Sequence, residues 1–64
     1  MDQQLAFSVN VAAARSGISR SRLYEAIRDG QLIAKKFGRS TIIRDADLED
    51  FLERLPAIEP RVRL

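Results

Sequence analysis

Two stretches of the chain carry apolar residues at the spacing of an amphipathic helix. Between residues 46 and 55, leucine or phenylalanine recurs at positions 48, 51, 52 and 55, which is the i, i+3, i+4, i+7 pattern of a core-facing stripe. Residues 20–29 carry a similar stripe of Leu23, Ala26 and Ile27. The pattern predicts two helices that each bury one face. Asp45 should cap the later helix and Pro56 should end it.

Serine and glycine residues indicate where the earlier helices begin and end. Ser8 and Ser19 each suit a helix N-cap, because a serine hydroxyl accepts a hydrogen bond from a free backbone N–H. Gly17 and Gly30 suit the left-handed conformation that closes a helix. The sequence therefore predicts a short alanine-rich helix over residues 9–15, a tight turn and a second helix over 20–29, which together form a helix-turn-helix.

After the second helix the pattern changes to two β-rich segments, residues 32–37 and 40–44. Gly38 and Arg39 separate them, and a two-residue loop that begins with glycine is typical of a type II′ hairpin. This turn predicts the cross-strand pairs Phe37–Ser40, Lys36–Thr41, Lys35–Ile42 and Ala34–Ile43. Ile43 and Ala34 should face the core, which leaves Ile42 to contact either a neighbouring protomer or the first helix.

The elements together predict an α+β fold, a winged helix-turn-helix with a two-stranded β-hairpin wing and a C-terminal helix. We expect a flexible N-terminus over residues 1–6, a DNA-binding domain over 7–55 and a flexible basic tail over 56–64. A chain of 64 residues holds one domain, and its core is thin.

The composition excludes several classes of function. The chain has no cysteine and no histidine, so it lacks disulfides, thiolate ligands, a cysteine nucleophile and the commonest general base. We therefore predict no enzyme, no metal site and no cofactor. The longest apolar runs are too short for a membrane span or a signal peptide, and we expect a cytoplasmic protein with no membrane partner.

Charge is unevenly distributed, although the net charge is only +2. Residues 15–44 carry eight basic and two acidic side chains, whereas residues 45–64 carry three basic and six acidic ones. A basic middle is expected of a protein that binds a polyanion, but mixed charges on a solvated face would give the same count. The acidic helix would be repelled by DNA, so we assign it to the scaffold.

The second helix and its cap present groups that can read DNA: Ser19, Arg20, Ser21, Arg22, Tyr24, Glu25 and Arg28. Arginine can bind guanine through two hydrogen bonds, glutamate can accept one from cytosine, and serine can contact bases or phosphates. An ordinary amphipathic helix with Glu25 and Arg28 paired on its surface would carry the same residues. This helix alone leaves both interpretations open.

The hairpin is the second candidate DNA contact, through Lys35, Lys36, Gly38, Arg39, Ser40 and Arg44. Lysines on an edge strand often serve only to prevent aggregation. Four cations with no acidic residue among them exceed that need, which favours a wing that grips phosphates or a minor groove.

The ordered string of residues resembles a known family. The similarity lies in residues 7–13, in Ser16-Gly-Ile-Ser-Arg-Ser-Arg-Leu-Tyr-Glu-Ala-Ile-Arg-Asp-Gly30, in Ala34-Lys-Lys-Phe-Gly-Arg39 and in residues 43–52. It is shared with the excisionases, or recombination directionality factors, which are small winged helix-turn-helix domains related to the DNA-binding domain of MerR-like regulators. The resemblance implies a recognition helix over 19–29 in the major groove and a wing around Gly38 in the adjacent minor groove. It makes Arg28 a phosphate contact and Tyr24 either a phosphate contact or a core residue.

The resemblance also implies a role. Excisionases bind adjacent sites on double-stranded DNA side by side, bend it and bias an integrase toward excision. The chain departs from the family pattern at Ser40, Thr41 and Ile42, where members usually have a basic residue and often an aromatic one. It also lacks the long dimerisation helix of MerR-like regulators after residue 55, which favours the excisionase resemblance. Two other hypotheses remain: a small transcriptional regulator that uses the same face, and a protein-interaction module that docks through the acidic helix or the tail.

Overall fold

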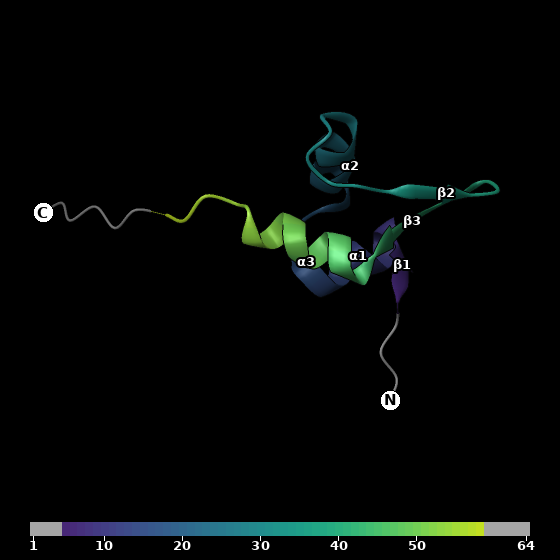
Figure 1. The fold of residues 1–64 in the computed structure, drawn as a ribbon, viewed down its shortest axis with the longest axis horizontal. Coiled ribbons are helices and arrows are strands. Elements are labelled where there is room, and N and C mark those ends of the chain that lie inside the picture. Colours follow the sequence, from purple (N-terminus) through teal and green to yellow (C-terminus); the bar gives the residue numbers. More distant parts are fainter. Residues whose placement is uncertain (1–4, 59–64) are drawn as a thin grey trace, which may run out of the picture.

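Three strands and three helices form the part of the chain that the computed structural model describes, residues 5–58 (Figure 1). The elements are β1 (Ala6–Ser8), α1 (Val9–Ser16), α2 (Arg20–Arg28), β2 (Lys35–Phe37), β3 (Ser40–Arg44) and α3 (Asp45–Glu53). The α+β winged helix-turn-helix fold predicted from the sequence is confirmed. Most of the predicted flexible N-terminus and basic tail lies outside the described residues, although Ala6 belongs to β1.

The helix-turn-helix forms where the capping residues predict it. The Ser8 and Ser19 hydroxyls accept hydrogen bonds of 3.2 Å from the backbone N–H groups of Val11 and Arg22. Gly17 ends α1 with a φ of 80°, and its N–H donates to the Ala13 carbonyl oxygen at 2.9 Å. Because these signals depend only on residues three or four positions apart, they are legible in the sequence.

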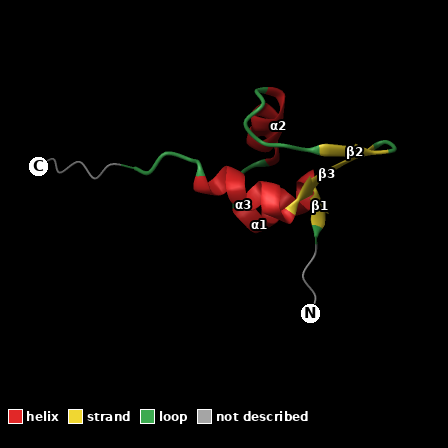
Figure 2. Ribbon diagram, viewed as in Figure 1, coloured by secondary structure: helices red, strands yellow, loops and turns green. Residues whose placement is uncertain are grey.

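The hairpin of β2 and β3 has the predicted register at three of the four expected pairs, with Phe37 opposite Ser40, Lys36 opposite Thr41 and Lys35 opposite Ile42. Because β2 begins only at Lys35, it is shorter than the predicted segment 32–37, and the expected Ala34–Ile43 pair is not part of the ladder. Gly38 has a φ of 64°, whereas no residue other than glycine among those described has a positive φ. A type I′ turn needs positive φ at both loop positions, so this pattern agrees with the predicted type II′ turn. The hairpin extends away from the helices (Figure 2).

The sheet has a third strand that the sequence analysis did not predict. β1 pairs antiparallel with β3 and gives the strand order β1-β3-β2, with Phe7 opposite Ile43 and Ser8 opposite Ile42. The base of the wing is therefore fixed to the start of α1. Ile42 lies between Ser8 and Lys35 in this sheet and is half-buried.

The core lies where the helices meet one face of the sheet. Its buried residues are Phe7, Val9, Ala12, Leu23, Ala26, Leu32, Ile43, Leu48 and Phe51. Leu52 and Leu55, which the helical pattern placed in the core stripe, are exposed. The prediction fails there because α3 ends at Glu53 and buries only the side that carries Leu48 and Phe51.

The predicted N-cap of the last helix is wrong. The cap position is Arg44, which makes no capping hydrogen bond through its side chain, and Asp45 is the first helical residue. The backbone N–H of Asp45 donates to the carbonyl oxygen of Leu5 at 2.8 Å. The strand pairing beside it thus gives one of the free N–H groups in the first turn of α3 a backbone acceptor.

Candidate nucleic-acid interface

The outer face of α2 carries exposed polar and charged side chains. Leu23 and Ala26 bury the opposite face, which leaves Ser21, Glu25 and Arg28 in solvent. Helix periodicity therefore produces the surface that the sequence analysis assigned to base reading. The side chains in question are parts of one short helix, so they can approach a single groove of DNA together.

Two arginines of this face are held only loosely by acidic neighbours. Arg22 Nη1 lies 3.5 Å from Glu25 Oε1, and Arg28 Nε lies 3.8 Å from Asp29 Oδ1. All four side chains are about half exposed or more, and ion pairs of this kind contribute little to stability. The predicted surface pair of Glu25 with Arg28 is replaced by a pair of Glu25 with Arg22. These guanidiniums can exchange their partners for a base or a phosphate at small cost.

The N-terminal turn of α2 holds a second arrangement, in which Arg20 stacks on Tyr24. The Arg20 guanidinium carbon lies 5.0 Å from the centroid of the Tyr24 ring, which is a cation–π geometry. Tyr24 is 40% exposed and is not among the buried core residues. Of the two alternatives for this residue, the surface position is the one observed. The Tyr24 ring therefore stacks against the Arg20 guanidinium at the N-terminal end of α2.

The wing presents three cations that have no acidic partner. Within residues 5–58, no carboxylate oxygen lies within 4.0 Å of a charged nitrogen of Lys35, Lys36 or Arg39. All three side chains are exposed, as are Gly38 and Ser40. Lys35 is near enough to Asp47 to help lower the pKa of that carboxyl, but no ion pair neutralises these three cations within residues 5–58. The hairpin therefore projects positive charge, which is what contact with phosphates requires.

Arg44 differs from the other wing cations because α3 supplies it with a carboxylate. Arg44 Nε donates to Asp47 Oδ2 at 2.8 Å and Arg44 Nη2 donates to Asp47 Oδ1 at 3.1 Å, which makes a bidentate pair. The hydrogen bond from Arg44 holds the pKa of the Asp47 carboxyl below its ordinary value. The hairpin sequence contains four cations and no acidic residue, as expected, but in the folded chain Asp47 of α3 pairs with one of these cations, Arg44. This pair ties the end of the wing to α3.

The Arg44–Asp47 pair predicts a stability that depends on pH. Because the pKa of Asp47 is lowered by folding, its contribution is fully present above about pH 4 and is lost as the pH falls through the lowered value. We expect Asp47→Asn to lower the thermal midpoint at neutral pH and to match the wild-type chain at about pH 2. Melting curves at both pH values test this, and a deficit of equal size at both would contradict it.

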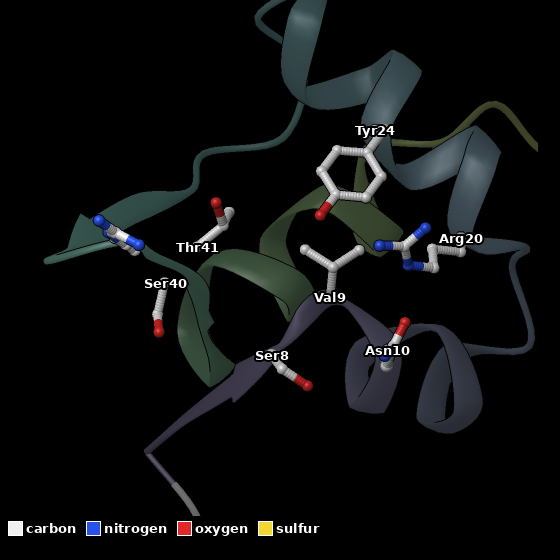
Figure 3. Close-up of a pocket in the computed structure, with 8 residues that line it drawn as sticks. Ser8, Val9, Asn10, Arg20, Tyr24, Ser40 and Thr41 are labelled. Carbon is white, nitrogen blue, oxygen red and sulfur yellow. The ribbon is translucent and has the colours of Figure 1, made fainter.

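An open groove of about 220 Å³ connects α2 to the wing. It is lined by Ser8, Val9, Asn10, Arg20, Tyr24, Arg39, Ser40 and Thr41. Figure 3 shows Arg20 and Tyr24 reaching into it from α2, with Ser8, Val9 and Asn10 at the start of α1 and Thr41 on β3. The lining contains guanidinium, phenol, hydroxyl and amide groups, all of which bind phosphate oxygens in protein–DNA complexes. No residue of α3 is among those that line it.

The groove contains three polar residues that the sequence analysis did not select: Ser8, Asn10 and Thr41. Their position depends on β1, which brings the start of α1 beside β3. Unless β1 is predicted, the sequence indicates only that Ser8 is a helix cap and that Asn10 is a helix residue. The register of the hairpin predicts that Thr41 lies opposite Lys36, but it does not predict that Thr41 lies near α2.

A comparison with protein families matches residues 6–56 to the family described as Helix-turn-helix domain. The chain belongs to this helix-turn-helix family. A comparison with curated proteins and one with solved structures find no match. The match covers both the α2 face and the wing, and membership supports DNA binding by this chain.

Other kinds of site find no support in the described part of this helix-turn-helix domain. Between residues 5 and 58, no group of three or more acidic side chains is placed to hold a metal ion. No helix within the same range is long and apolar enough to cross a membrane. Helix-turn-helix domains of this family are typically non-enzymatic. The candidate functional site consists of the polar groove and the basic faces beside it.

Proposed function

We propose that this chain is a sequence-specific double-stranded DNA-binding protein of the excisionase type. In this proposal α2 enters the major groove and the β2–β3 wing enters the adjacent minor groove. One observation carries it: Arg20 and Tyr24 of α2 and Arg39 of the wing line the same groove. A DNA backbone that passes through this groove has α2 on one side and the wing on the other, as neighbouring major and minor grooves require.

Each side chain of the site has a role that follows from its chemistry. Arg22 has the planar donor geometry that binds either a guanine or a phosphate, Arg28 would contact a phosphate, and Glu25 can accept a hydrogen bond from cytosine. Arg20 and the phenol of Tyr24 face the groove, where a phosphate would lie. Ser19 accepts a bond from the Arg22 N–H, which leaves its hydroxyl proton to donate to a phosphate oxygen.

The small size of this surface supports the excisionase role that the resemblance implies. A single recognition helix and wing bury about 600–1,000 Å² on DNA, and this supports only moderate affinity. Adjacent copies bound side by side, or contact with an integrase, would supply the rest of the binding energy. Bending adds specificity through base steps that no side chain touches. We therefore propose that several copies bind adjacent sites and shape DNA for an integrase.

The affinity should depend strongly on salt. Six cations reach the proposed interface without a strong acidic partner: Arg20, Arg22, Arg28, Lys35, Lys36 and Arg39. If each meets one phosphate, log affinity falls with log salt at a slope of about −5. Arg39→Ala should make the slope shallower by about 0.9. Fluorescence anisotropy with a labelled duplex measures both slopes, and a slope near zero would contradict the proposed contact.

The role itself is tested by sequencing the fragments that the purified chain binds in DNA from its own source. Several adjacent sites next to an integrase gene or an attachment site would support the excisionase role. Isolated or paired sites over promoters would instead indicate a transcriptional regulator that uses the same face. If no fragment is enriched over random duplex at low salt, the DNA-binding proposal fails and a protein-interaction module becomes the better account.

A further inference from the structure

The end of the wing carries an exposed aromatic ring that the proposed contacts do not use. Phe37 is 79% exposed, whereas Phe7 and Phe51 are buried in the core. A single apolar side chain in solvent is ordinary on a protein surface. The position of Phe37 is unusual, because it is the last residue of β2 before the turn and therefore lies at the part of the hairpin farthest from the helices (Figure 1).

The surroundings of Phe37 are basic. Lys36 precedes it, Arg39 follows within the turn, and Lys35 shares its face of the strand because side chains alternate. None of these three cations forms an ion pair with a carboxylate of the described residues. An apolar ring flanked by cations complements a surface on which phosphates flank the apolar faces of bases. Nucleic acid has that combination, and a protein surface seldom does.

We infer that Phe37 is a wedge that inserts between two base pairs when the wing lies in the minor groove. The inference rests on the proposed function and adds the residue that would bend the DNA. Phenylalanine is one of the side chains that architectural proteins insert between base steps, where it partly unstacks them and kinks the duplex. Lys36 and Arg39 hold the phosphates on either side of the opened step. Pyrimidine–purine steps open most easily, so the wing favours a TA or CA step at this point.

A second copy of the chain is a less suitable occupant for this ring. The apolar residues of the wing besides Phe37 are the half-buried Ile42 and the buried Ile43. One ring supplies far less than the about 800 Å² per partner of a stable protein interface. The cations around it would also repel the same cations on another wing.

Bending and base stacking in matched duplexes test the inference. The probe is a duplex of about 30 base pairs that carries a site recovered from bound fragments, with a donor and an acceptor dye at its ends. A second duplex has 2-aminopurine at the step nearest the wing, where unstacking raises fluorescence. The variants are Phe37→Ala, Phe37→Leu and, as a control, Ile58→Ala, which removes an apolar side chain that is 91% exposed on the segment after α3.

We expect Phe37→Ala to lose most of the bend and the fluorescence increase, and to bind about tenfold more weakly. Phe37→Leu should keep at least half of the bend because leucine also acts as a wedge, and Ile58→Ala should behave as the wild-type chain. The exposed ring contributes little to the core, so all variants should melt as the wild type does.

Four results would overturn the inference. If the wild-type chain binds its site without bending it, or if Phe37→Ala bends and unstacks it as the wild type does, there is no wedge, although the chain remains a DNA-binding protein. If Phe37→Ala only weakens binding to two adjacent sites and leaves the single-site bend unchanged, the ring contacts a second copy instead. Failure of the wild-type chain to bind any duplex would overturn the proposed function as well.

Discussion

Replacing Arg20, Arg22 and Arg28 together with alanine should weaken binding to a specific site by about 100-fold or more. The three guanidiniums are exposed on α2. Arg22 and Arg28 form weak surface ion pairs, and Arg20 stacks on Tyr24. Each can make charge-assisted hydrogen bonds to a base or phosphate that alanine cannot replace. The fold should survive, because all three side chains are exposed and alanine favours the helix. Anisotropy with a specific duplex, alongside circular dichroism, measures both effects.

Two matched variants separate base reading from general charge. The triple lysine variant, with Arg20, Arg22 and Arg28 each changed to lysine, keeps the charge but loses the bidentate geometry. It should retain salt-dependent binding to random duplex and lose its preference for the specific site. Arg54→Ala removes one positive charge on the scaffold, where Arg54 contacts Asp50 and the Gln31 carbonyl oxygen, and should change affinity by less than about threefold. A folded triple alanine variant that binds like the wild type would contradict the assignment of α2.

The second large effect is on folding. Leu23 is 0% exposed at the centre of the core, on the face of α2 opposite the arginines. Leu23→Ala should destabilise the chain by about 2–5 kcal/mol, the transfer cost plus that of the cavity left behind. A core in a chain of this size supplies only about 3–5 kcal/mol in total. The variant should therefore be largely unfolded near 37 °C, and urea denaturation followed by circular dichroism measures the loss.

Leu5→Ala is the control for this prediction. It makes the same change at a side chain that is 83% exposed, and it keeps the backbone carbonyl that accepts the Asp45 N–H. We expect a change of about 0.5 kcal/mol or less. Equal losses for the two variants would show that Leu23 is not the central core residue of this domain.

Local signals in the sequence predict much of this fold. The caps at Ser8 and Ser19, the turn at Gly17 and the hairpin register around Gly38 each depend on neighbours within a few positions, and all four are confirmed. The candidate α2 and wing residues follow from the same signals, because helix and strand periodicity determine which side chains point outward. Their roles in binding stay predictions.

Contacts between distant segments account for what the sequence did not reveal. β1 has three residues, and its pairing with β3 joins positions more than thirty residues apart. No local pattern indicates that pairing, so the start of α1 could not be placed in the groove, and Ser8, Asn10 and Thr41 were missed. Because β1 was not predicted, the hydrogen bond from the Asp45 N–H to the Leu5 carbonyl oxygen could not be predicted either. The spacing of three between Arg44 and Asp47 is compatible with an ion pair, but nothing in the sequence favours this pair over other pairs of opposite charge.

If α2 and the wing together form the surface that meets DNA, binding should perturb both of them and spare α3. Titration of the isotope-labelled chain with a duplex at low salt, with each backbone amide followed by NMR, measures this. We expect the largest chemical-shift changes in residues 19–28 and 35–41 and small ones along Asp45–Glu53. Shifts confined to that acidic helix, or no shifts at all, would contradict it.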